Sequence, residues 1–128
     1  MSEELAGDWY NEFGSHLRLV ADPAGRLTGT FTPGAGPGGR RDLVGQFDVG
    51  TTAAGIALGW TVAWRDEYGG PASVTSWSGQ WLPGEQRIVA GWLFTTATDP
   101  DEAWKATVIG RDTFLRRPSS GAAGRPGA

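Results

Sequence analysis

The sequence predicts an all-β protein, an eight-stranded antiparallel up-and-down β-barrel. Segments rich in Thr, Val, Trp and Phe recur between residues that favour turns. Glycine (21) and proline (8) together make up nearly a quarter of the 128 residues, and no segment has the pattern of a helix of ordinary length. Short strands joined by short links form a meander, and closing it into a barrel removes its exposed edges.

The expected strands cover residues 6–13, 16–21, 26–32, 41–48, 56–65, 72–82, 86–96 and 104–115. Turn chemistry separates them. Residues 22–25 (DPAG) predict a tight turn after the second strand, and residues 33–39 (PGAGPGG) a flexible connection after the third. Residues 69–71 (GGP) and 83–85 (PGE) predict turns before the sixth and seventh strands. Residues 99–102 (DPDE) are expected to start a short helical turn before the last.

Length and composition indicate one domain, over residues 1–117, followed by a flexible tail over residues 118–128. The chain has no cysteine, which excludes a disulfide framework and a cysteine nucleophile. The net charge of −3 does not indicate binding to nucleic acid, which needs an excess of positive charge. No apolar run approaches the roughly 20 residues of a membrane span. The first residues lack the pattern of a signal peptide.

Seven tryptophans, at positions 9, 60, 64, 77, 81, 92 and 104, call for an explanation beyond core filling. They favour an aromatic box around a ligand or an exposed stacking platform. Strand alternation decides which side chains share a face. The sets that are expected to face inward are Asn11, Phe13 and Ser15; Trp60, Val62 and Trp64; Ser73, Thr75 and Trp77; and Trp92 with Phe94.

These sets mix large rings with hydroxyls and an amide, whereas an ordinary core would carry aliphatic residues. A buried polar group without a partner costs about 1–3 kcal/mol. A polar ligand inside the barrel would supply partners. The alternative is that these groups satisfy one another or bind buried water.

Five ordered blocks of the sequence resemble the avidin/streptavidin family of biotin-binding proteins, and most closely its bacterial, streptavidin-like branch. The blocks are GDWYN at residues 7–11, LTGT at 27–30, ALGWTVAW at 57–64, TSWSGQ at 75–80, and AWK at 103–105 with GRDTF at 110–114. The resemblance covers nearly the whole chain before the tail. It implies a barrel that binds and sequesters biotin without catalysis and without a cofactor.

The resemblance also implies roles for individual residues. Asn11 and Ser15 match donors to the ureido oxygen of biotin, and Asp112 matches the acceptor for a ureido N–H. Thr75 matches the partner of the ring sulfur, while Ser73, Ala35 and Gly36 match contacts to the tail carboxylate. The implied walls are Trp64, Trp77, Trp92 and Phe94, and Phe13 is a further expected site residue. Trp104 matches a tryptophan that completes a neighbouring subunit's site in a homo-oligomer, most simply a tetramer.

Two positions depart from the family pattern. Phe31 stands where a tyrosine hydroxyl is expected, and Pro33 where a small hydroxyl residue is expected. Each change removes one hydrogen-bonding group from the head of the pocket. We therefore expect biotin binding that is tight but weaker than that of the strongest relatives.

Other sequence patterns give weaker evidence about function. Residues 34–39 formally fit G-x-G-x-x-G, but Pro37 argues against the helix that a nucleotide site needs. His16 is the single histidine and is expected to face outward, so neither a metal site nor a Ser–His triad is predicted. The alternative functions are a lipocalin-like carrier of another ligand and a carbohydrate-binding module; an enzyme is not expected. Relatives are typically exported, so secretion is expected by resemblance.

Overall fold

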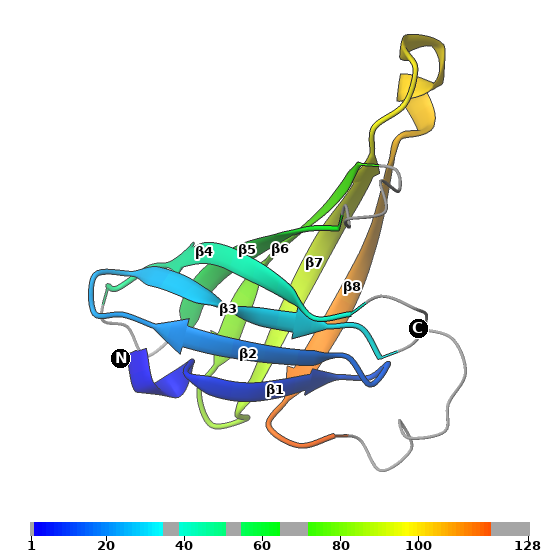
Figure 1. Ribbon diagram of the computed structural model, residues 1–128. Helices are drawn as coiled ribbons and strands as arrows, with labels where there is room; N and C mark the ends of the chain where they lie inside the picture. Colours follow the sequence, from blue (N-terminus) through cyan, green and yellow to red (C-terminus); the bar gives the residue numbers. More distant parts are fainter. Residues whose placement is uncertain (1, 35–38, 51–54, 65–71, 119–128) are drawn as a thin grey trace.

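A computed structural model of the protein describes residues 2–34, 39–50, 55–64 and 72–118, and within them eight strands form one closed antiparallel barrel (Figure 1). Each strand pairs with its sequence neighbours, and β1 closes the barrel against β8. The strands are β1 (Gly7–Asn11), β2 (His16–Ala21), β3 (Arg26–Thr32), β4 (Arg41–Phe47), β5 (Ile56–Ala63), β6 (Ser73–Leu82), β7 (Arg87–Thr96) and β8 (Thr107–Leu115). The predicted fold class is confirmed.

The clearest difference from the predicted strands lies before β8. Residues 104 and 105 were expected in that strand, but they belong to a 3-10 helix, η2 (Pro100–Lys105), and β8 begins at Thr107. The helix starts at a proline, which favours the first turn because its missing N–H would have no helical partner there. The short helical turn predicted in this region is therefore confirmed and is longer than expected. A second 3-10 helix, η1 (Ser2–Glu4), was not predicted.

The first strand also ends earlier than predicted, at Asn11 rather than residue 13. The Asn11 side chain is the reason, because its Oδ1 accepts the backbone N–H groups of Phe13 (3.0 Å) and Ser15 (2.8 Å). A side chain that bonds its own backbone a few residues ahead turns the chain and ends the ladder.

Alternation along the strands produces the core. On β5 the buried residues are Ile56, Leu58, Trp60 and Val62, while the residues between them are more exposed. On β2, Leu17 and Leu19 are buried, whereas His16 is only partly covered on the outer face, as predicted. Such a period-two pattern is what a sheet with one buried face requires.

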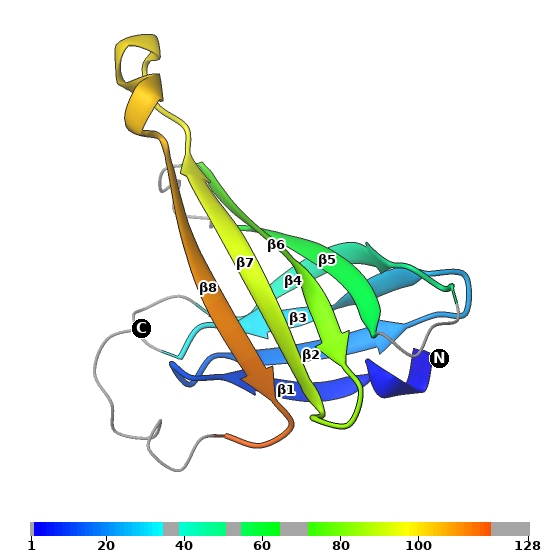
Figure 2. The ribbon, with the colours of Figure 1, turned by 180° about the vertical axis from the view of Figure 1, so that it is seen from behind.

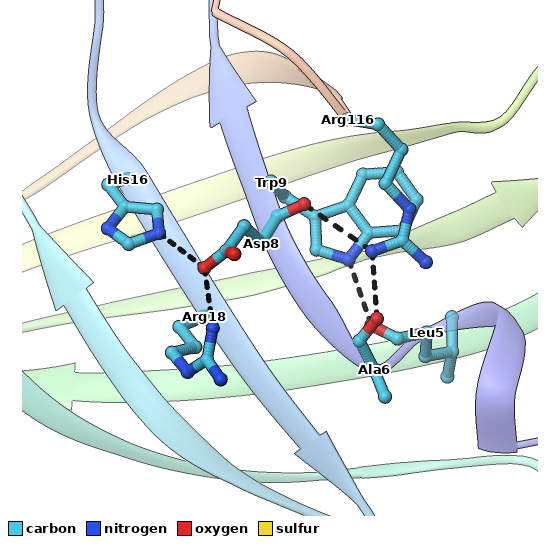
Figure 3. Close-up of polar contacts among 7 residues, drawn as sticks. All are labelled: Leu5, Ala6, Asp8, Trp9, His16, Arg18 and Arg116. Carbon is cyan, nitrogen blue, oxygen red and sulfur yellow. Dashed lines mark hydrogen bonds and ion pairs between the residues drawn. The ribbon is translucent and has the colours of Figure 1, made fainter.

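One end of the barrel is closed by a cluster around Trp9, which is fully buried (Figure 3). Its indole Nε1 donates to the carbonyl of Leu5 at 2.8 Å, and the Arg116 guanidinium lies 3.8 Å from the centre of its ring. Arg116 also donates to the carbonyls of Glu4 (2.7 Å) and Ala6 (2.8 Å). The residue after β8 thus ties the end of the chain's last strand to the segment before the first, by hydrogen bonds and a cation–π contact.

Two features of the outer surface are the ion pairs of Asp8 and the short helix η2. Beside the closed end, the Asp8 carboxylate accepts from His16 and from Arg18, each at 2.8 Å (Figure 3), and these contacts, His16 first, lower the pKa of Asp8. At the opposite end, η2 projects beyond the barrel at the tip of the β7–β8 hairpin (Figures 1 and 2). In the described part of the chain, no helix has the length and apolar character needed to cross a membrane.

Candidate functional site

The end of the barrel opposite Trp9 opens into a cavity of about 430 Å³. This volume is within the range of small-molecule sites. Its wall consists of Asn11, Phe13, Ser15, Phe31, Pro33, Trp64, Thr75, Trp77, Trp92, Phe94 and Asp112. All of them were predicted site residues, and they come from strands or adjoining segments spread around the barrel.

Aromatic rings form most of the cavity wall and support one another. The Phe31 ring packs edge-on against Trp64, with centroids 5.8 Å apart, and tilted against Trp77 at 4.9 Å. Trp77 in turn stacks on Trp60 at 5.4 Å. Trp60 is buried below the wall, so the ring that faces the cavity rests on a second indole. Rings packed in this way hold their orientation without a ligand, which keeps the pocket preformed.

The Asn11 amide has its orientation fixed by the backbone. Since its Oδ1 already accepts two backbone N–H groups, its Nδ2 amine is the end that remains to donate. These two contacts also settle which end of the amide is oxygen. Asn11 is 4 % exposed, so this donor acts away from bulk water.

The Ser15 hydroxyl is set in a similar way. Its Oγ accepts the backbone N–H of Gly34 at 3.0 Å, which leaves the hydroxyl hydrogen free to donate. A Cβ on Gly34 would lie 2.4 Å from the carbonyl oxygen of Phe13, so no larger residue fits where this loop meets the first turn. The contact thus positions Ser15 just before β2.

Thr75 on β6 repeats this arrangement. Its Oγ1 accepts the indole N–H of Trp64 at 2.8 Å, and its own hydroxyl hydrogen remains available. Because Trp64 follows β5, this bond also fixes one aromatic wall against the neighbouring strand.

The Asp112 carboxylate is the acidic group of the cavity. Burial raises its pKa above the ordinary value, the nearby charge of Glu12 raises it further, and hydrogen bonds from Trp77, Asn11 and Trp92 act in the opposite direction. The Trp77 bond to Oδ2 measures 2.9 Å. A carboxylate offers about four acceptor positions, so it has capacity for a ligand N–H as well.

The cavity therefore has a defined polarity. Asn11 and Ser15 present donors, Asp112 presents an acceptor, and aromatic rings line the space around them. Hydrogen bonds in such a low-dielectric space are stronger than in water. The matching ligand carries an acceptor oxygen beside an N–H group, as amides and ureas do. Among the residues described here, no group of three or more His, Cys, Asp or Glu side chains could hold a metal ion.

Four predicted site residues are not in this wall. Ser73 is at the start of β6, where it lines a separate depression with Ala63 and Thr95. Trp104 is 82 % exposed on η2 and lies outside the cavity. Ala35 and Gly36 lie outside the described residues.

Trp60 was assigned to the inward face by alternation but was not predicted as part of the site. Its role depends on the pairing Trp60↔Trp77 between β5 and β6, which brings the two indoles together. Register between strands would have been the signal, and a single sequence gives only the order of the strands.

Comparison with known protein families gives a match over most of the chain. The model of the avidin family matches residues 1–117 of the chain. The match therefore extends from the N-terminus through β8 to the residue after Arg116.

Proposed function

The chain belongs to the avidin family, a family of binding proteins rather than enzymes, and we propose that it binds and sequesters biotin in the cavity at the open end of its barrel. The observation that carries this proposal is the fixed polarity of the cavity: buried donors on Asn11 and Ser15 lie in the same aromatic-walled space as the acceptor on Asp112. We further place the chain in the bacterial, streptavidin-like branch of the family, on its sequence blocks.

The ureido head of biotin has the complementary polarity. Its carbonyl oxygen would accept from Asn11 and Ser15, while a ring N–H would donate to Asp112. These contacts reinforce one another, since donors at the oxygen and a carboxylate at the nitrogen both favour the charge-separated form of the urea. The hydroxyl of Thr75 would meet the ring sulfur, which is a weak acceptor.

The rest of the ligand needs apolar walls and a polar exit. Trp64, Trp77 and Trp92 would enclose the bicyclic ring, together with Phe13 and Phe94. Ser73, Ala35 and Gly36 are proposed contacts for the tail carboxylate at the mouth.

Phe31 and Pro33 line the cavity without offering a side-chain hydrogen bond. Phe31 is 5 % exposed and packs against two tryptophans, so its ring contributes to the wall instead. We propose that affinity is high but below that of the tightest relatives, because the head of the ligand lacks two polar partners.

A subunit standing by itself exposes much of Trp104. Exposed large rings are unfavourable unless a partner covers them. We propose a homo-oligomer, most simply a tetramer, in which Trp104 completes a neighbouring subunit's site. Proteins of this family are generally secreted, and we propose the same for this one, with residues 1–117 as the binding domain. Nearly all of the tail predicted over residues 118–128 lies outside the described residues.

Titration calorimetry with biotin tests the function directly. We expect one site per subunit, with quenched or shifted tryptophan fluorescence at the same stoichiometry, because several indoles line the cavity. A long-chain fatty acid and a soluble sugar serve as comparison ligands, and neither should bind at the same concentrations. Binding of the fatty acid but not of biotin at micromolar concentration would favour the lipocalin-like carrier and contradict the proposal.

A further inference from the structure

The seam between β1 and β8 is the shortest junction of the barrel. Among the described residues, it has two backbone pairs, Tyr10↔Leu115 and Asn11↔Phe114. The other junction of β8, with β7, has nine, from Arg87↔Leu115 to Thr95↔Thr107. The seam nevertheless closes the barrel beside the cavity, so side chains must supply part of what the backbone ladder lacks.

Glu12 occupies the next position of this seam. Continuing the register places Glu12 opposite Thr113, but the backbone has already left the ladder because Asn11 turns it. The Glu12 side chain takes over: its Oε1 accepts the backbone N–H of Thr113 at 3.0 Å. A carboxylate thus fills the position that a strand carbonyl would otherwise hold.

The position of this bond matters for the cavity. Glu12 follows Asn11 on one side of the seam, and Thr113 follows Asp112 on the other. Asn11 and Asp112 are the proposed donor and acceptor for the ligand head, and both line the cavity. Any movement of β8 away from β1 at Thr113 would change the separation of these two groups.

We propose that Glu12 is a positioning residue for the ligand site: by holding Thr113 across the seam, it fixes Asp112 relative to Asn11. Glu12 itself is exposed and does not line the cavity. Its effect on the ligand passes through Asp112. The expected effect of Glu12 on biotin affinity rests on the proposed function, whereas its expected effect on the position of Asp112 does not.

Two substitutions separate the hydrogen bond from the charge. Glu12→Gln keeps a side-chain oxygen that can accept from Thr113, whereas Glu12→Ala removes the acceptor. At pH 7 we expect Glu12→Ala to weaken biotin binding by on the order of three- to tenfold, the size of one lost hydrogen bond, and Glu12→Gln to bind within about twofold of the unchanged protein. Glu85→Ala is the matched control, since Glu85 is also an exposed acid with a partner, Arg87, but lies in the β6–β7 turn at the closed end.

A second readout needs no ligand. The indole N–H of Trp77 donates to Asp112, so its resonance in a ¹H–¹⁵N spectrum reports the position of that carboxylate. In the empty protein, Glu12→Ala should shift this indole signal and speed the exchange of the Thr113 amide hydrogen. Glu12→Gln should largely preserve the Thr113 protection, and Glu85→Ala should change neither signal.

Each outcome of these experiments either supports or contradicts the proposal. Weakened binding and a shifted Trp77 signal in Glu12→Ala, with near-normal binding in Glu12→Gln, support the proposal. Equal loss in both variants would overturn it, because the charge and not the hydrogen bond would then act. An unchanged Trp77 signal in Glu12→Ala would overturn it as well, even with faster Thr113 exchange. If the unchanged protein ignores biotin, the proposed function fails, and the Trp77 signal still decides whether Glu12 positions Asp112.

Discussion

Tryptophan has a different role at each end of the barrel. At the closed end, the N–H of Trp9 bonds to the backbone carbonyl of Leu5, and the Arg116 guanidinium covers its ring. At the open end, the N–H groups of Trp64 and Trp77 bond to the side chains of Thr75 and Asp112. Tryptophan therefore seals one end and organises polar groups at the other.

The polar residues follow the same division. In the described part of the chain, the buried polar residues are Asn11, Ser15, Thr75 and Asp112, and all of them line the cavity. The interior next to Trp9 is filled by apolar side chains such as Leu5 and Leu17. Buried polar groups cost stability unless they are paired. The difference indicates that the closed end stabilises the fold, whereas the open end retains hydrogen-bonding capacity for a ligand.

The largest expected effect tests the closed end. Trp9→Ala removes a fully buried indole and the surface on which Arg116 packs, and should lower the free energy of unfolding by about 3–5 kcal/mol. Denaturant unfolding at fixed protein concentration measures this loss. Trp104→Ala on a dissociated subunit is the control and should change little, because that ring is exposed. A Trp9→Ala protein as stable as the original would remove the distinction between the two ends.

Asp112→Asn tests the open end. Asn keeps an acceptor for Trp77 but loses the charge, and charge-assisted hydrogen bonds are roughly twice as strong as neutral ones. We expect biotin affinity to fall by about 1–2 kcal/mol, roughly 5- to 30-fold. The empty protein should become more stable, because a buried carboxylate is costly. Calorimetry and denaturant unfolding should thus move in opposite directions; a loss of both would make Asp112 structural.

The affinity for biotin at the open end should also depend on pH. A ligand N–H needs the ionised carboxylate, and burial raises the pKa of Asp112 in the empty protein. Affinity should therefore fall as the pH drops through that raised pKa, by up to about tenfold over each further pH unit. Asp112 by itself stabilises the empty fold in the reverse sense: its contribution is present below the unfolded pKa and is lost as the pH rises through the folded one.

Calorimetry with a biotin amide measures this dependence, because the amide removes the ligand's own titrating carboxylate. Asp112→Asn should show a flat profile over the same range. A profile that is flat in the unchanged protein would show that Asp112 does not receive the ligand proton.

The smallest effect concerns the head of the cavity. Phe31→Tyr adds a hydroxyl to a ring already in the wall and should raise biotin affinity by about 1 kcal/mol, close to fivefold. The dissociation rate is the sensitive measurement. No gain would mean that water or a shifted ligand already replaces the missing donor, and affinity should then match that of the tightest relatives.

Much of the site could be predicted from the sequence because alternation in strands is strict. Thr75 and Trp77, for instance, are both buried in the cavity wall, as predicted from their shared face of one strand. Asp112 was placed by resemblance, and the structure brings it to Trp77 across a separation of 35 residues. The prediction that residues 104 and 105 belong to a strand was wrong, because the start of a strand and a 3-10 turn that begins at a proline have similar sequences in a short polar segment.

The sequence by itself determined the number of strands, their order and which side chains face inward, since turn residues and period-two patterning are local properties of the chain. Tertiary structure decided the register, the direction of each hydrogen bond and the stacking of Trp60 beneath Trp77. It also gave Glu12 its partner 101 residues away. Such pairings depend on where the barrel closes, and closure is set by the packing of all strands together rather than by any one segment.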